Sequence, residues 1–269
     1  GGGDNQRAQV VGGSSGERWD ALFGFEFDVR KAIHARQRDF MDSLDDDPAG
    51  KAPQATAIAY RRNAATGRNI DPGANGCDAA SDIYGGSVFR AFNPRQGWYC
   101  GSNEAAASYW TVQTEKRNLN GYGLLTFHVN ETTDLFADLA VGSARITNNT
   151  RAPTWTSARN YFYNQTTGNL ESWYRRFAPE EIGGLPRNAN RFLENSWSFN
   201  VGARGQIGDS GWDYEAVYSR SRYENRTRRP VLLAGINEYL LGPKLGVRNG
   251  VEVYAPDPAR LFQPLSPNE

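Results

Sequence analysis

The sequence is poor in histidine, cysteine and methionine, and it has no excess of charge of either sign. Only His34 and His128, two cysteines and one methionine occur in 269 residues, and 30 basic residues balance 30 acidic residues. A metal centre or a Ser–His–Asp centre would have to be built from these two histidines, whose sequence surroundings favour neither. Balanced charge also gives no general attraction for nucleic acid. We therefore expect no nucleic-acid partner, no metal site and no cofactor.

Long apolar runs and the common catalytic motifs are also missing. Mean hydropathy is −0.66 and no stretch of about 18 apolar residues occurs. This excludes a transmembrane helix but not a membrane barrel, because only every second residue of a barrel strand faces lipid. H-E-x-x-H, C-x-x-C, G-x-S-x-G, P-loop and dinucleotide-binding motifs are absent. Paired carboxylates such as Glu26 and Asp28, or Asp213 and Glu215, resemble a glycosidase pair in spacing, but a water-facing role is favoured. We expect no enzymatic activity.

The chain contains instead long segments in which apolar and polar residues alternate. In residues 19–30 the odd positions are almost all apolar, whereas the even positions are mostly Asp, Gly, Glu and Arg, with Leu22 as the exception. A period of two places the odd side chains on one face of a β-strand. The pattern predicts strands at about 7–12, 18–33, 115–130, 133–147, 194–207 and 211–226.

The length of these segments predicts the class of protein. Strands of globular proteins run to about 5–6 residues, whereas a tilted strand that crosses a membrane needs about 9–11. Aromatic residues near the segment ends suit a membrane–water interface, although aromatics also favour strands in general. These aromatics are Trp19, Tyr109, Trp110, Trp197, Trp212 and Tyr223. We therefore predict an all-β fold that forms an antiparallel transmembrane β-barrel.

The connections between the segments alternate between short and very long. Tight turns are predicted at 12–16, 130–133 and 208–211, where Gly, Asp, Asn and Ser are frequent. Long connections are predicted at about 34–108, 147–193 and from 226 to the end. Outer-membrane barrels have short periplasmic turns and long extracellular loops. Charged stretches at 45–48 and 226–230 indicate solvated loops; the alternatives are cation binding by the carboxylates and contact of the arginines with lipopolysaccharide or ligand.

Cys77 and Cys100 lie within one long polar stretch of the chain. An even number of cysteines in a single loop is typical of a disulfide formed in an oxidising compartment. The alternative is a pair of unrelated free thiols, but free cysteines are usually buried in apolar surroundings. Here the neighbours are Asn, Gly, Asp and Ser. We predict a disulfide between the two residues.

Several of these segments together resemble one known family, the TonB-dependent outer-membrane receptors. Residues 18–27 with 38–43 resemble an early barrel hairpin of that family. The strand–turn–strand units 120–124 with 131–137, and 199–205 with 212–216, are similar to its repeating hairpins. The tail segments 237–243 and 261–265 resemble its loops. Each motif is loose, and the resemblance depends on their joint order over most of the chain.

The resemblance implies a barrel of 22 strands, an N-terminal plug domain and a TonB box. Neither the plug nor the TonB box is visible in residues 1–269, so we expect these residues to be a partial barrel domain. The implied function is uptake of a scarce nutrient (siderophore-bound iron, cobalamin, a saccharide or a peptide) with energy supplied through TonB. The implied partners are the TonB complex, reached through the missing N-terminal region, the small nutrient ligand, and outer-membrane lipid with lipopolysaccharide. The implied location is the outer membrane of a Gram-negative bacterium.

A ligand contact is predicted in the segment that precedes Cys100. Its residues are Arg90, Phe92, Arg95, Trp98 and Tyr99, which combine stacking surfaces with positive charge. The alternative is that these aromatics simply pack the loop. Two other functions remain open at this point: a secreted carbohydrate-binding β-sandwich or glycosidase module, and a passive porin-like barrel without TonB coupling.

Overall fold

The computed structural model describes residues 3–48, 54–157 and 161–265. Strands make up 54% of the chain and helices 14%, which confirms the prediction of an all-β fold with antiparallel sheets. The chain divides into two compact units that alternate along the sequence. The sheet unit comprises Gly1–Ile33, Gln113–Asn148 and Asn190–Arg228, and the core unit comprises His34–Val112, Asn149–Ala189 and Arg229–Glu269.

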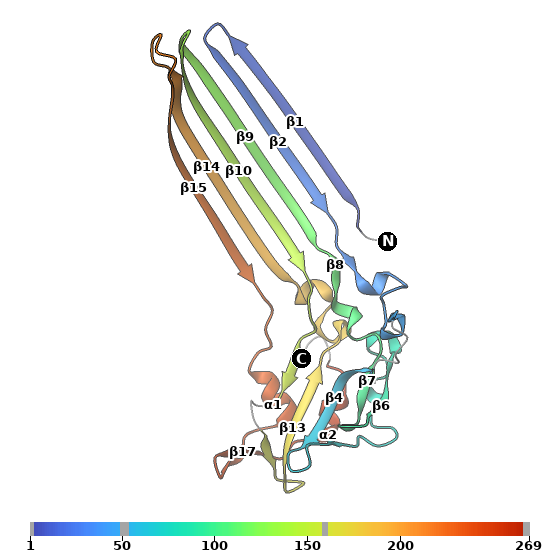
Figure 1. Ribbon diagram of the computed structural model, residues 1–269. Helices are drawn as coiled ribbons and strands as arrows, with labels where there is room; N and C mark the ends of the chain where they lie inside the picture. Colours follow the sequence, from blue (N-terminus) through green and yellow to red (C-terminus); the bar gives the residue numbers. More distant parts are fainter. Residues whose placement is uncertain (1–2, 49–53, 158–160, 266–269) are drawn as a thin grey trace. The chain divides into compact units, whose positions relative to one another are not determined.

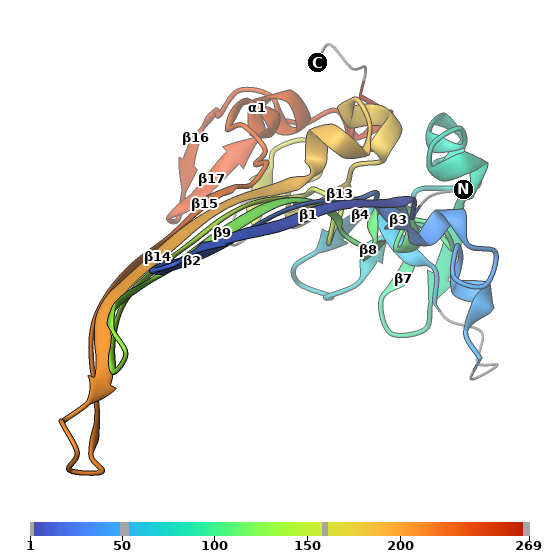
Figure 2. The ribbon, with the colours of Figure 1, turned by 90° about the horizontal axis from the view of Figure 1, so that it is seen from above.

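The sheet unit is one six-stranded antiparallel sheet (Figure 1). Its order is β1 (Asn5–Gly16), β2 (Trp19–Arg30), β9 (Glu115–Asn130), β10 (Thr133–Asn148), β14 (Asn190–Gln206) and β15 (Asp213–Arg228). Every strand has 12 or more residues, about twice the length of an ordinary strand. In Figure 2 the sheet is curved along its strands, most clearly in β14 and β15. β1 and β15 are the two edges of the sheet.

The predicted turn at 12–16 is wrong, because these residues continue β1. Gly12 pairs with Phe23 and Gly16 pairs with Trp19, so the turn consists of the two residues 17 and 18. A Cβ at Gly12 would lie 2.7 Å from the Phe23 ring, and one at Gly16 would lie 2.5 Å from the Trp19 ring. The glycines thus give room to aromatic rings from the neighbouring strand, and they are strand residues rather than turn residues.

The other two tight turns lie where the sequence places them. Between β9 and β10, the side chain of Asn130 accepts the backbone N–H of Thr132 at 2.9 Å, which is a common turn contact of Asn. Between β14 and β15, Gly208 and Gly211 have φ values of 52° and 73°, which glycine adopts at little steric cost. Local chemistry therefore sets both turns.

Strand register gives the sheet one apolar face and one polar face. Directly paired residues share a face, so rows of side chains can be followed across all six strands. One such row on the apolar face runs through Val10, Phe25, Gly121, Val141, Trp197 and Arg222. The next row on the polar face runs through Glu26, Asn120, Gly142, Ser196 and Tyr223. The polar face also carries a few apolar side chains, among them Leu22 and Leu124.

Within the described part of the chain, every buried hydrophobic side chain belongs to the core unit. The apolar face of the six-stranded sheet is open: Phe25 is 57% exposed, Leu125 49% and Leu139 47%. A folded soluble sheet normally covers its apolar face with another layer. The described residues provide no such layer for this sheet.

The core unit is built around a nine-stranded sheet of short strands. Its main path is β16 (Gly246–Arg248), β17 (Val251–Tyr254), β12 (Phe162–Asn164), β13 (Asn169–Arg176), β4 (Thr56–Asn63), β7 (Gly97–Ser102) and β6 (Val88–Asn93). Two further strands lie off this path: β11 (Thr154–Thr156) beside β13 and β5 (Asn69–Ile70) beside β4. The pair β12 and β17 is parallel. A separate two-stranded sheet consists of β3 (Ile33–His34) and β8 (Thr111–Gln113).

The helices of the described residues are short. The α-helices are α1 (Gly235–Leu241) and α2 (Pro258–Phe262). The 3₁₀-helices are η1 (Ala35–Gln37), η2 (Leu44–Asp46), η3 (Asp78–Ala80), η4 (Tyr84–Gly86), η5 (Ala107–Tyr109), η6 (Pro179–Ile182) and η7 (Leu185–Asn188). None of these helices has the length and apolar character that a membrane crossing requires.

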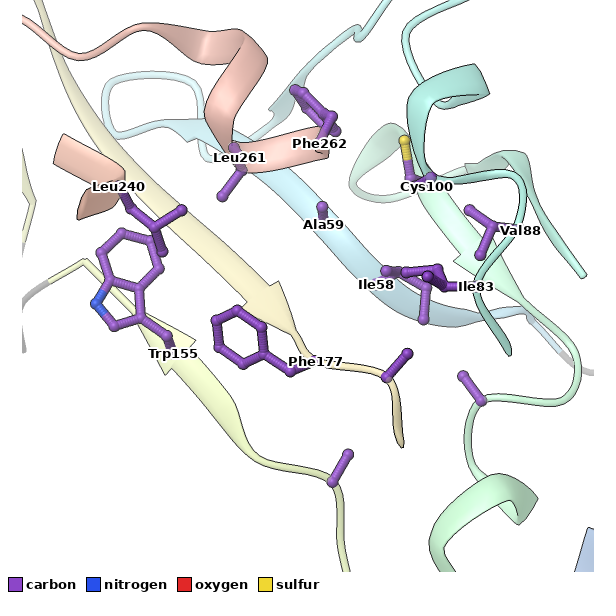
Figure 3. Close-up of a cluster of buried hydrophobic side chains, with 14 of the residues drawn as sticks. Ile58, Ala59, Ile83, Val88, Cys100, Trp155, Phe177, Leu240, Leu261 and Phe262 are labelled. Carbon is purple, nitrogen blue, oxygen red and sulfur yellow. The ribbon is translucent and has the colours of Figure 1, made fainter. Parts of the chain in front are cut away.

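The long connections that the sequence predicts as loops are not irregular, because much of them folds into the core unit. Segments from all three connections contribute to one apolar cluster, including Ile58, Trp155, Phe177, Leu240 and Leu261 (Figure 3). Tyr109, which the sequence places in an interfacial belt, is fully buried there and donates its hydroxyl to the Phe177 carbonyl at 3.0 Å. The prediction for Tyr109 is therefore wrong. Contact with distant segments, and not local pattern, decides its position.

The core unit also buries an ion pair. Arg175 of β13 and Glu181 of η6 are each 1% exposed in their side chains, and Nη2 lies 2.5 Å from Oε1. Glu181 also accepts the backbone N–H groups of Ala178 at 2.6 Å and Leu265 at 3.0 Å. These bonds satisfy the carboxylate, which would otherwise be costly to remove from water.

The structure confirms the disulfide between Cys77 and Cys100, whose Cα atoms are 5.6 Å apart. The bond joins the start of η3 to strand β7, which lies between β4 and β6 in the core unit. Both cysteines are buried, so the bond fixes a polar segment against the core.

Replacing both cysteines with alanine is expected to destabilise the protein by about 3 kcal/mol, because a closed loop of this length restricts the unfolded chain. The sequence separation is 23 residues. Urea unfolding, followed by tryptophan fluorescence, measures the change, and reduced wild-type protein is the matched control. An unchanged midpoint, or two free thiols in non-reducing mass spectrometry, contradicts the prediction.

Candidate functional site

The predicted ligand residues lie on the β6–β7 hairpin of the core unit. Phe92 of β6 pairs directly with Trp98 of β7, and Arg90 pairs with Cys100. Directly paired and alternate residues share one face of a sheet. Arg90, Phe92 and Trp98 therefore lie on the same face, next to the disulfide. We call these three residues the Trp98 platform.

The three side chains of the Trp98 platform contact one another. The rings of Phe92 and Trp98 have centroids 4.8 Å apart at an interplanar angle of 53°. The guanidinium carbon of Arg90 lies 3.6 Å from the Trp98 ring centroid, which is a close cation–π contact. Phe92 is 48% exposed. The platform thus presents aromatic surface to solvent.

Arg90 is held by a carboxylate from an earlier segment. Its Nε lies 3.0 Å from Oδ1 of Asp71 and its Nη2 lies 2.5 Å from Oδ2, the two-point geometry in which guanidinium and carboxylate match. Asp71 also accepts the backbone N–H of Gly73 at 2.9 Å. The charge of Arg90 is therefore largely compensated. Its structural role is to hold Trp98, and the platform offers a ligand stacking surface more than free positive charge.

The structure separates two of the predicted residues from this platform. Tyr99 is on the opposite face of the hairpin, where it is 5% exposed and its hydroxyl donates to the Ala55 carbonyl at 2.7 Å. Burial raises the pKa of the Tyr99 phenol. Arg95 lies in the exposed turn, where its backbone N–H contacts the Asn93 side chain at 2.8 Å. Asp71 belongs to the site although the sequence gives no signal for it, because it approaches only through the fold.

The hydrogen bonds from Arg90 hold the pKa of the Asp71 carboxyl below its ordinary value of 3.8. An ion pair that lowers the pKa of its acid stabilises the folded state fully at neutral pH. This stabilisation is lost as the pH falls from the carboxyl pKa of the unfolded chain through the lower pKa of the folded chain. In the Arg90→Gln variant we expect the Asp71 pKa to return upward. A carbon-detected NMR titration of the Asp71 carboxyl checks this, with Arg36→Gln as the control. Identical titrations of wild type and Arg90→Gln contradict the assignment.

A second candidate site lies on the polar face of the sheet unit. A hollow of about 570 Å³ there is lined by small residues, such as Gly142 and Ser198, and by larger ones, such as Tyr122 and Tyr223. Its row through Gly24, Tyr122, Ala140, Ser198 and Ser221 crosses five strands. Hydroxyl and amide groups in such a hollow can hydrogen-bond a polypeptide or a polar ligand. Sequence reasoning missed this hollow because its glycines and serines are far apart along the chain.

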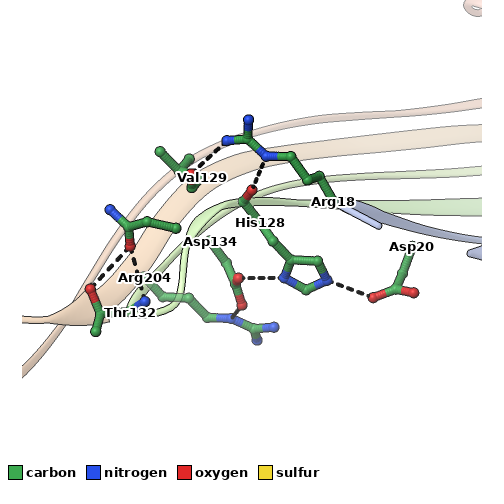
Figure 4. A network of polar contacts seen from close by, with 8 residues as sticks. Arg18, Asp20, His128, Val129, Thr132, Asp134 and Arg204 are labelled. Carbon is green, nitrogen blue, oxygen red and sulfur yellow. Dashed lines mark hydrogen bonds and ion pairs between the residues drawn. The ribbon is translucent and has the colours of Figure 1, made fainter. Parts of the chain in front are cut away.

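His128 is part of a network of polar contacts that links neighbouring strands near the turns (Figure 4). Its Nε2 lies 2.9 Å from Oδ2 of Asp20, and its Nδ1 lies 2.8 Å from Oδ1 of Asp134. Arg204 then contacts the other oxygen of Asp134 at 3.4 Å. Since both ring nitrogens are engaged, His128 has none left to activate a nucleophile or bind a metal. The network joins β2, β9, β10 and β14.

Within residues 3–48, 54–157 and 161–265, carboxylates and histidines form no candidate metal site. Among the described residues, no group of three or more His, Cys, Asp or Glu side chains is arranged to hold a metal ion. Glu26, which resembles half of a glycosidase pair in the sequence, forms an ion pair with Arg7.

Comparison of the chain with models of known protein families, with curated proteins and with solved structures found no match.

Proposed function

We propose that the six-stranded sheet is part of the wall of an outer-membrane barrel, and that the protein takes up a scarce nutrient with energy supplied through TonB. One observation supports this proposal above all others. A sheet of six long strands has an apolar face that no described residue covers. Lipid tails are the environment in which such a face is stable without a covering layer.

The apolar side chains on the apolar face of the sheet form a continuous band, which we call the apolar band. Its edge on the side away from the tight turns is inclined to the strands, as a bilayer boundary would be. On β2 the band ends at Val29, which is in register through the intervening strands with Arg226 of β15. On β15 the band already ends at Tyr218, eight residues before Arg226. The last members of the band on the intervening strands are Leu119, Val141 and Trp197, and only Leu193 lies beyond them. The boundary thus recedes between β2 and β15, although Val141 and Trp197 lie in the same row.

The angle of this boundary can be compared with strand tilt. Eight residues at about 3.3 Å span about 26 Å, and four strand spacings of about 4.8 Å span about 19 Å. The band edge is therefore inclined to the rows by about 50°. A flat bilayer cuts strands that are tilted by about 45° along a line of similar inclination.

The polar face fits the same arrangement, since it carries Asp, Glu, Asn and Ser and would face the barrel interior. The Trp98 platform of the core unit offers exposed aromatic surface for ligand capture. By resemblance to TonB-dependent receptors, the ligand classes are siderophore-bound iron, cobalamin, saccharide and peptide. The resemblance also supports the outer membrane as the location, lipid and lipopolysaccharide as neighbours, and coupling to TonB through a plug domain outside this chain.

Single-cysteine probes test the membrane arrangement directly. We expect an environment-sensitive dye at Phe25→Cys, Leu125→Cys or Val201→Cys to report hydrocarbon in lipid vesicles and to be quenched by brominated lipid. Matched probes at Asn120→Cys, Ser198→Cys and Asn200→Cys on the polar face should report water. The native cysteines do not interfere, because they form the disulfide.

A different set of results would contradict the membrane arrangement. A monomeric, detergent-free protein with cooperative melting and shielded apolar-face probes supports a secreted β-sandwich and contradicts the proposal. The sequence encoded upstream of residue 1 distinguishes the two membrane functions. A plug domain there supports the TonB-coupled receptor, and a signal peptide directly there supports a passive porin.

A further inference from the structure

Two adjoining rows on the apolar face, at the edge of the apolar band, are rich in arginine. One row contains Arg117, Arg145 and Arg226, and the next contains Arg191 and Arg228. Glu115 is the one carboxylate in these two rows. We call the five arginines the arginine cluster.

The register places like charges directly against each other in this cluster. Arg117 is paired with Arg145, and Arg191 is paired with Arg228. Like charges directly opposite on a sheet face destabilise the pairing of the strands. Two such pairs in neighbouring rows concentrate positive charge in this part of the sheet face.

The described carboxylates compensate this charge only in part. Arg117 forms an ion pair of 3.3 Å with Glu115, and Arg226 lies 4.0 Å from Glu224, which also pairs with Arg222. Among the described residues, no ion pair involves Arg145 or Arg228. The cluster therefore retains positive charge that an anion could neutralise.

The same arginines line a hollow. Four members of the cluster, together with side chains from β10 and β14, surround about 310 Å³. The lining residues are Arg145, Ile146, Thr147, Arg191, Phe192, Leu193, Arg226 and Arg228. Guanidinium groups match phosphate oxygens in two-point hydrogen bonds. The site has the charge, the donors and the space that a phosphate group needs.

We propose that the arginine cluster binds the phosphate of a lipid headgroup whose acyl chains lie along the apolar band. This inference rests on the proposed membrane location. Val141 and Trp197 lie on the same face, four residues nearer the turn than Arg145 and Leu193 on their strands. A lipid engages both the arginines and this apolar surface, whereas free phosphate engages only the arginines. Basic clusters beside an apolar surface are a general recognition feature for anionic lipids.

Quenching of Trp197 by brominated lipid tests the proposal. The chain is inserted into phosphatidylcholine vesicles that contain a minor fraction of either brominated phosphatidic acid or brominated phosphatidylcholine. We expect the association constant near Trp197 to be at least about tenfold higher for phosphatidic acid, since each arginine contributes about fivefold. The Trp197→Phe variant identifies the part of the quenching that arises at this position. Inorganic phosphate should not displace the lipid.

Variants assign the effect to the cluster. We expect the triple change Arg145→Gln, Arg226→Gln, Arg228→Gln to abolish the preference. A control with the same loss of charge in the core unit, Arg36→Gln, Arg68→Gln, Arg151→Gln, should retain it. Should the triple variant fail to insert, Arg145→Gln and Arg228→Gln alone should each lower the preference about fivefold.

Each remaining outcome overturns the inference. Equal quenching by the two lipids, or a preference that survives the triple change, shows that the cluster does not select phosphate lipids. Displacement by inorganic phosphate identifies a free anion as the ligand. In these cases the membrane location stands, because the chain has inserted. Failure of the wild-type chain to insert into any vesicle overturns both the location and this inference.

Discussion

Leu139→Arg is expected to prevent stable insertion of the chain into lipid vesicles. Leu139 is in the apolar band, between Gly123 and Phe199 on the neighbouring strands, and it is 47% exposed. An arginine at a lipid-facing position near the bilayer midplane of a barrel costs about 2–4 kcal/mol. This corresponds to a decrease of about two orders of magnitude in the insertion equilibrium. Urea-dependent folding into vesicles, measured by tryptophan fluorescence and protease protection, gives the change.

The next residue provides the matched control. Ala140 is on the polar face, among the small side chains of the 570 Å³ hollow, and Ala140→Arg places the same charge toward water. We expect Ala140→Arg to insert nearly as well as wild type. Equal insertion of Leu139→Arg and Ala140→Arg would show that the two faces of the sheet do not differ in their surroundings. The membrane proposal would then fail.

The second large effect is expected in the core unit, where Arg175→Met should lower the free energy of unfolding by about 3–5 kcal/mol. Removal of one partner from a buried ion pair leaves the other charge uncompensated. Glu181 would keep its two backbone N–H donors but lose the guanidinium at 2.5 Å. Guanidinium chloride unfolding, monitored by circular dichroism and fluorescence, measures this loss.

Two variants make the interpretation of Arg175→Met specific. Arg151→Met removes an exposed arginine of the same unit and should change stability by less than about 0.5 kcal/mol. The double variant Arg175→Met, Glu181→Leu should recover much of the loss, because replacement of both charges by apolar groups is often neutral. If Arg175→Met is as stable as wild type, loss of the guanidinium does not leave Glu181 as an uncompensated buried charge. A double variant no better than the single one would indicate a packing defect instead.

The long strands were predictable because a simple physical rule acts along them. When one face of a strand is apolar and the other polar, the sequence alternates with a period of two, and the alternation identifies the strand. The segment 115–130 shows this and corresponds to β9 (Glu115–Asn130). The end of β1 was not predictable in this way. Gly12 and Gly16 are typical of turns, and only the rings of Phe23 and Trp19 on the partner strand explain them.

The core unit could not be predicted because its signals are not local. β12 and β11 have three residues each, too few to establish a period. Its cluster joins Ile58, Trp155 and Leu240 from three distant segments. The disulfide was predictable because two cysteines allow a single pairing. The position of Asp71 beside Arg90 was not predictable, because this contact depends on how two segments meet in space.

The sheet has two edges, β1 and β15, and each presents backbone donors and acceptors that no described strand engages. In hydrocarbon, each unsatisfied peptide group costs several kcal/mol. A six-stranded sheet with open edges is therefore unstable in a bilayer. The backbone N–H and C=O groups along Asn5–Gly16 and Asp213–Arg228 must find hydrogen-bond partners. Pairing of both edges, with further strands or with the edges of another copy, is therefore a condition for residence in lipid. Blocking this edge pairing should therefore shift the chain from insertion to aggregation.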